Sequence, residues 1–183
     1  ILRKQQEGFP QGSLPVYPNT TIRSIGKMEM ERKEKARMLI LEFEEHRTNE
    51  EGKEIFESCD WWKELVSKAA QDADRFEVRC WEDEQEGIAF GQQYGQKQES
   101  STKEIVFAGE LTGQALSVLV DDCVGADGVL KYFTLNLYAG GKPLFSSSHY
   151  GSEIYWMKDS FAEIGFLMMM TKKYPLIKGF DKR

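Results

Sequence analysis

The stretch "KPLFSSSHYGSEIYWM", residues 142–157, contains the residue types best suited to chemistry. Three consecutive serines, 146–148, precede His149, one of the two histidines of the chain, and Glu153 follows four residues later. Nucleophilic catalysis requires a hydroxyl group hydrogen-bonded to a base, and an acidic group that orients the base. Ser148, His149 and Glu153 supply these groups, so one hypothesis for this chain is a hydrolase.

Local geometry favours a structural role for the same stretch. In a continuous strand His149 and Glu153 would share a face but lie about 13 Å apart, and a helix would bring only these two together. The glycines of a GxSxG nucleophile elbow are also missing. We therefore predict a strand that ends at 146–148 and a helix capped by Ser152. Free amides and hydroxyls at such a helix start suit an anion or ligand. The candidate contact residues are Ser147, Ser148, His149 and Ser152.

Metal and cofactor motifs are not evident in the sequence. The segment "DDCVGADG", 121–128, has three carboxylates but lacks the alternation and the closing glutamate of a calcium loop. His46, at the end of a predicted helix, suits the negative end of the helix dipole better than a metal. Neither glycine-rich phosphate-binding pattern occurs. We expect no metal and no cofactor.

Charge is spread unevenly along the chain. The net charge is −6, yet residues 1–27 carry +3 and residues 172–183 carry +4, which leaves −13 on residues 28–171. Such an acidic region repels phosphate backbones and attracts basic protein surfaces. It also suits a protein whose charge only maintains solubility. We expect a protein partner with a basic surface, and no direct contact with nucleic acid.

The acidic segment "EVRCWEDEQE", 77–86, is the best candidate for that contact. It has five carboxylates against Arg79, and Trp81 lies among them. Tryptophan is enriched at interface hot spots, and negative patches steer basic partners. The alternative is a solvated hairpin tip with Trp81 packed on a neighbouring strand. The predicted partner-binding residues are Glu77, Trp81, Glu82, Asp83, Glu84 and Glu86.

Length and cysteine content indicate one intracellular domain. A chain of 183 residues suits a single domain, which we predict as an extended arm at 1–27 followed by a domain at 28–183. Three cysteines without metal-like spacing favour a reducing compartment, and we expect the cytoplasm. The longest apolar run, 164–170, is too short to span a membrane, so no membrane association is expected.

Hydrophobic spacing predicts helices at both ends of the domain. Apolar residues recur at helical spacing over 28–47 and around 60–73. A further helix is predicted over 153–172, where Ile154, Met157 and Phe161 begin a stripe at intervals of three and four.

Between these helices the sequence predicts about six consecutive strands. Alternation indicates strands at 75–83, 87–94, 103–111 and 129–138, and Gly140-Gly141 signals a hairpin into "KPLFSSS". Residues 114–121 fit either a helix or a strand, and the Thr-Gly pair before them favours a hairpin.

This order predicts an α+β fold: two N-terminal helices, an antiparallel sheet of about six meandering strands, and a C-terminal helix packed on the sheet. The preferred function is a non-enzymatic acidic interaction module, such as an immunity protein or an inhibitor that mimics nucleic acid. If the arm adds a first strand, the order is similar to the helix-grip, START-like arrangement. That resemblance implies a domain that binds an apolar ligand between the sheet and the last helix. The expected lining residues are Phe133, Leu135, Phe161, Ile164 and Met168.

Overall fold

A computed structural model describes residues 38–44 and 47–183, which lie within one compact unit that begins at residue 36. The predicted arm at 1–27, most of the helix predicted at 28–47, and His46 lie outside the described residues.

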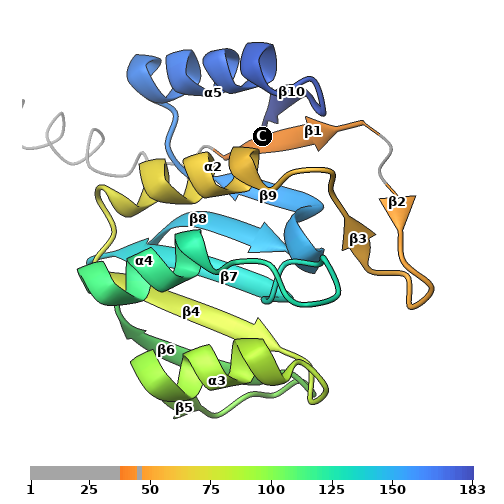
Figure 1. Ribbon diagram of the computed structural model, residues 1–183. Coiled ribbons are helices and arrows are strands. Elements are labelled where there is room, and N and C mark those ends of the chain that lie inside the picture. The colour runs from red at the N-terminus through yellow and green to blue at the C-terminus, as the bar shows by residue number, and fades with distance from the viewer. Residues whose placement is uncertain (1–37, 45–46) are drawn as a thin grey trace, which may run out of the picture. The chain divides into compact units, whose positions relative to one another are not determined.

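One antiparallel sheet of eight strands organises this unit (Figure 1). Its strand order is β10-β1-β9-β8-β7-β4-β6-β5. A separate two-stranded ribbon pairs β2 with β3. The strand bounds are β1 (Leu39–Phe43), β2 (Arg47–Thr48), β3 (Glu54–Ile55), β4 (Arg75–Cys80), β5 (Gln96–Gln98), β6 (Ile105–Glu110), β7 (Thr134–Ala139), β8 (Lys142–Ser148), β9 (Glu153–Trp156) and β10 (Ile177–Lys182).

Four helices of the described residues pack against the same face of this sheet. They are α2 (Asp60–Ala70), α3 (Gln85–Tyr94), α4 (Gly113–Asp121) and α5 (Phe161–Lys173). The indole of Trp62 on α2 donates to the Ser147 hydroxyl of β8 at 2.8 Å. The indole of Trp156 on β9 donates to Glu163 of α5 at 2.9 Å. The opposite face of the sheet carries no helix of the described chain (Figure 1).

Strand alternation places the core between the sheet and these helices. Phe76, Leu137, Phe145 and Trp156 pair in register across β4, β7, β8 and β9, and all four are fully buried. The residues directly before and after each of these four in its strand therefore face the other side of the sheet. The predicted α+β class with an antiparallel sheet is confirmed, but the predicted number of elements is wrong.

The helix predicted over 28–47 is wrong where the structure describes it. Residues 39–43 form β1, which lies between β9 and β10. Leu39 and Leu41 are buried and Glu42 is exposed, so the burial repeats every two residues. The helical spacing of apolar residues in this segment was coincidental.

One segment predicted as a strand is a helix, and so is the segment for which both a helix and a strand were considered. Residues 85–94 form α3, whose buried Gly87, Phe90 and Gly91 recur at helical spacing. A Cβ on Gly91 would lie 2.3 Å from the Phe107 ring, so this glycine permits close packing and does not signal a turn. Residues 113–121 form α4, and the hydroxyl of Thr112 caps it by accepting from the Ala115 amide at 3.2 Å.

The C-terminal helix begins later than predicted. Residues 153–156 form β9, and α5 begins at Phe161 after a cap by Ser160, whose hydroxyl accepts from the Glu163 amide at 3.3 Å. Ser152 is therefore not the cap of this helix. A last strand, β10, follows Pro175 and was not predicted.

The other elements predicted within the described residues are present, although two strands are shorter than predicted. The strand predicted at 75–83 is β4, which ends at Cys80. The helix around 60–73 is α2, the strand at 103–111 is β6, and "KPLFSSS" is β8. Only the second half of the strand predicted at 129–138 is regular, as β7. Gly140 and Gly141 both have positive φ angles, 53° and 77°, as a two-residue hairpin requires.

The apolar cavity expected under the last helix is not formed by the residues predicted for it. Phe161 is 96% exposed, and Met168 is exposed on the same helix. Leu135 is fully buried in the core. These side chains therefore do not enclose a common cavity.

Among the described residues, no helix is both long enough and apolar enough to cross a membrane. Cys59, Cys80 and Cys123 are buried and carry free thiols.

Candidate functional site

The turn at His149–Gly151 between β8 and β9 has an unusual backbone. His149, Tyr150 and Gly151 all adopt left-handed φ angles, 48°, 56° and 90°. Non-glycine residues rarely adopt this region, and such conformations concentrate at functional sites. The Tyr150 amide donates to the Phe133 carbonyl at 3.2 Å, which fixes the turn. As a result the Tyr150 side chain points inward and is buried.

The same turn does not bring Ser148, His149 and Glu153 together in the way that the alternative hydrolase hypothesis requires. His149 Nδ1 lies 3.4 Å from Glu153 Oε1, so these two groups do pair. The Ser148 hydroxyl, however, has the Ser146 hydroxyl as its partner, at 3.5 Å. Within the described residues no hydrogen bond joins Ser148 to His149. His149 therefore does not activate the Ser148 hydroxyl as a nucleophile, which the hydrolase hypothesis requires.

The predicted anion-contact residues are also separated. Ser147 points into the core and accepts from Trp62, whereas Ser148 points to the opposite face of β8. Ser152 donates to the His149 carbonyl at 3.0 Å and closes the turn. His149 packs on the Phe133 ring, with centroids 5.0 Å apart.

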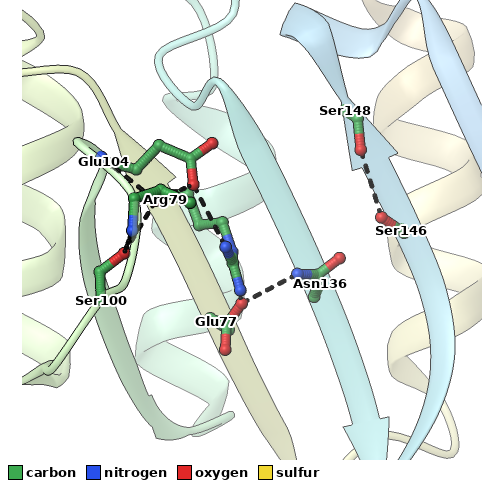
Figure 2. A network of polar contacts seen from close by, with 8 residues as sticks. Glu77, Arg79, Ser100, Glu104, Asn136, Ser146 and Ser148 are labelled. Carbon is green, nitrogen blue, oxygen red and sulfur yellow. Dashed lines mark hydrogen bonds and ion pairs between the residues drawn. The ribbon is translucent and has the colours of Figure 1, made fainter.

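The helix-free face of the sheet carries a paired polar network (Figure 2). Glu77 accepts from Arg79 Nε at 2.8 Å and from Asn136 at 3.0 Å. Arg79 also donates to Glu104 at 3.2 Å. Arg79 thus lies between the carboxylates of Glu77 and Glu104, so Glu77 is an ion-paired carboxylate on this face.

Four of the other predicted partner-binding residues, 81–84, connect β4 to α3, and Glu86 lies in the first turn of α3. Trp81 is half-buried and packs on Phe133, with ring centroids 5.1 Å apart, so it is not an exposed aromatic anchor. Glu82 is exposed. Asp83, Glu84 and Glu86 converge on a pocket.

This pocket has a volume of about 190 Å³ and lies where four segments meet. Its walls are the start of α3, the 125–131 loop, Lys53 beside β3, and the His149–Gly151 turn. A Cβ on Gly87 would lie 2.3 Å from the Lys131 carbonyl oxygen, so a glycine there lets the loop approach the helix. The lining residues are Lys53, Asp83, Glu84, Gln85, Glu86, Gly87, Gly125, Asp127, Val129, Leu130, Lys131 and Tyr150.

Glu84 is the most unusual group in the pocket. Its side chain is only 7% exposed. Oε2 accepts from the Trp81 amide at 2.7 Å, but the buried Oε1 has no hydrogen-bond partner. Burial raises the pKa of Glu84, while the nearby Tyr150 hydroxyl, the Trp81 amide and Lys53 oppose that increase. The pKa of Tyr150 is raised too, by burial and by Glu84.

Lys53 is held beside Glu84 by the turn between β2 and β3. The Asn49 side chain accepts from the amides of Glu51 and Lys53 and so shapes this turn. The Lys53 ammonium lies 5.4 Å from the Tyr150 ring centre. Its carboxylate contacts are long, at 3.5 Å to Glu51, 3.7 Å to Asp83 and 4.0 Å to Glu84.

Lys131 forms the second cation of the pocket. Its ammonium lies 2.7 Å from Asp122 and 3.8 Å from Glu86. The side chains of Lys53 and Lys131 are 17% and 9% exposed, whereas their partners Glu51, Asp83, Glu86 and Asp122 are between 54% and 72% exposed. We call these four carboxylates the acidic rim. The two lysines are thus less exposed than the acidic rim, and Glu84, which is 7% exposed, is a buried carboxylate of the same pocket.

Three residues of this pocket, Asp83, Glu84 and Glu86, were among the partner-binding residues predicted from the sequence, and the others were not. Lys53, Lys131 and Tyr150 lie far apart in the chain, and only the tertiary fold brings them together. The "HYG" at 149–151 was a usable signal, because the sequence places a tyrosine directly before a glycine in a predicted turn. Within residues 38–44 and 47–183, no group of three or more histidine, cysteine, aspartate or glutamate side chains is arranged to bind a metal.

The fold and the site together define an α+β protein with one covered sheet face and an acid-rimmed pocket. Comparisons with protein-family models, with curated proteins and with solved structures gave no match.

Proposed function

We propose that this protein is a non-enzymatic interaction module that binds a basic region of another protein through the acidic rim. The observation that carries the proposal is the separation of charges at the pocket. Both lysines are less exposed than the four rim carboxylates that they contact, so an approaching molecule meets the acidic rim first. A basic surface is attracted by such a patch, and a phosphate backbone is repelled.

The composition of the chain supports the same proposal. Residues 28–171 carry −13, so the rim lies in a strongly acidic region. Long-range attraction of this kind accelerates encounter with a basic partner and is screened by salt. Inhibition of a partner, as by an immunity protein or a nucleic-acid mimic, is the biological role that we propose for such binding.

Hexa-arginine is a suitable probe for the test, because it presents basic groups without a fold of its own. The rim variant Asp83→Asn/Glu86→Gln should bind it about fivefold more weakly than the original protein, since each exposed charge pair contributes about 0.2–1 kcal/mol. Isothermal titration calorimetry measures the affinities. Binding to the original protein should also weaken between about 50 and 300 mM NaCl.

The control variant is Glu99→Gln/Glu110→Gln, which has the same net charge and changes two exposed glutamates outside the pocket. It should bind hexa-arginine with an affinity close to that of the original protein. Equal weakening in both double variants would show that net charge alone attracts the peptide, and the proposed function would then be wrong.

A further inference from the structure

We propose that the pocket is a socket for one arginine side chain of the basic partner, whose guanidinium donates to Glu84. The inference rests on the function proposed above and adds which group of the partner is recognised. Glu84 lines the pocket, and its buried Oε1 makes no hydrogen bond, the Lys53 ammonium being 4.0 Å away. A buried acceptor without a donor is costly and rare in folded proteins. A donor supplied by a ligand removes that cost.

The charge of the site selects a cationic ligand. Six carboxyl groups surround only two ammonium groups here: those of Glu51, Asp83, Glu84, Glu86, Asp122 and Asp127 against Lys53 and Lys131. An anionic ligand would have to pass the acidic rim and then face Glu84 and Asp127. A cation passes the same rim with favourable interactions throughout.

The shape of the site favours arginine over lysine. Guanidinium is planar and has five donors that diverge, so it can reach acceptors on more than one wall. Glu84 and Asp127 belong to different segments of the pocket and offer such acceptors. Val129, Leu130 and the Tyr150 ring provide apolar surface for the methylene stem, and arginine stacks well on aromatic faces.

Lys53 already makes a looser form of the proposed contact. Its ammonium lies over the Tyr150 ring and 4.0 Å from Glu84, and its three carboxylate contacts are all 3.5 Å or longer. Lys53 is thus a resident cation without a short hydrogen bond to hold it in place. It competes with an incoming guanidinium for the same carboxylates, and its removal should favour the ligand.

The test uses the full chain labelled with ¹⁵N and titrated with N-acetyl-arginine N-methylamide. Amide signals of residues 83–87 and 125–131 should shift and saturate. The citrulline counterpart, which has the same shape without the charge, is the matched control ligand and should cause no such shifts. The lysine counterpart should bind more weakly than the arginine derivative. Equal binding of arginine and citrulline derivatives would overturn the proposal.

Glu84→Gln is the decisive variant. Glutamine can still accept from the Trp81 amide, so the turn into α3 is retained. The dissociation constant for the arginine derivative should rise about 10- to 100-fold, the effect of losing a hydrogen bond to a charged group in a buried site. The control Glu104→Gln removes a charge from another partly buried glutamate, on the helix-free face, and should leave binding unchanged.

Two further variants keep the proposal testable if Glu84→Gln does not fold. Asp127→Asn can still accept from the Val129 amide and should weaken binding, and Lys53→Gln should strengthen it. If Glu84→Gln and Asp127→Asn both bind the arginine derivative as tightly as the original protein, the proposal that this pocket binds an arginine side chain is wrong. The proposed function survives that result if the rim variant still loses affinity for hexa-arginine and its control does not.

Discussion

Replacing Glu84 with glutamine should stabilise the protein at neutral pH. The Glu84 carboxyl is almost completely buried; its Oε2 accepts from the Trp81 amide, and its Oε1 lies 4.0 Å from the Lys53 ammonium. Burial is the largest cause of its raised pKa, ahead of the favourable interactions with Tyr150, Trp81 and Lys53. The ionised carboxylate therefore makes a net unfavourable contribution to folding, and the neutral amide removes it.

The size of the effect follows from opposing contributions. Desolvation of a buried charge costs several kcal/mol. Attraction between Lys53 and Glu84 at 4.0 Å offsets about 4 kcal/mol of this at an effective dielectric constant of 20. Lys53 keeps its contacts with Glu51 and Asp83 after the substitution. We expect a net gain of about 1 kcal/mol in the free energy of unfolding, which raises Tm by about 2–4 °C for a chain of this size.

The stability difference between Glu84→Gln and the original protein should depend on pH. Because burial raises the pKa of Glu84, the folded protein binds the Glu84 proton more tightly than the unfolded chain does. The cost of ionisation is fully present above the folded pKa, and it disappears below the unfolded value of about 4.3. The stability advantage of Glu84→Gln should therefore shrink as the pH falls from 7 to 4.

Urea unfolding followed by tryptophan fluorescence measures both quantities at several pH values. The original protein and the variant are compared at each pH, so contributions from other titrating groups cancel. A variant that is less stable at pH 7, or a stability difference that does not change with pH, would show that the ionised Glu84 carboxylate does not destabilise the folded protein.

Three further substitutions test separate parts of the structure. Gly87→Ala should lower the free energy of unfolding by about 1–3 kcal/mol in urea titrations, because the new Cβ would lie 2.3 Å from the Lys131 carbonyl oxygen. Unchanged stability would show that the loop does not pack on α3 so closely. Ser147→Ala should cost about 1–3 kcal/mol by the same measurement, because it leaves the buried Trp62 indole without an acceptor; a neutral effect would mean that water or another group replaces the hydroxyl. Phe161→Ser should change the thermal unfolding midpoint little, since this side chain is 96% exposed, and a large loss would show that it is part of a core.

The fold class was predictable because the strongest sequence signals were local. Alternation at 103–111 and the Gly140-Gly141 pair each depend on neighbouring residues, and both predictions held. Segments whose apolar residues fit both the helical and the strand period could not be assigned to a helix or a strand in this way. At 39–43 and 153–156 the same apolar residues fit a helix and a strand, and only the neighbouring strands of the sheet decide between them.

The pocket was predictable only in part, for a related reason. The carboxylates at 83–86 are adjacent in sequence, and their charge was evident without a structure. Lys53 and Tyr150 reach them through the β2–β3 turn and through a left-handed turn after β8. No local pattern encodes those long-range contacts. Gly87 was predicted to begin a strand, whereas in the structure it lets Lys131 approach α3.

We propose that the acidic rim, and not the general charge of the protein, receives a basic partner. A ¹⁵N–¹H correlation spectrum of the full chain titrated with hexa-arginine locates the contact residue by residue. We expect the largest shifts at residues 51–53, 83–87 and 122–131. Shifts that are spread evenly over the surface, or concentrated on the helix-free face around Glu77 and Arg79, would contradict it.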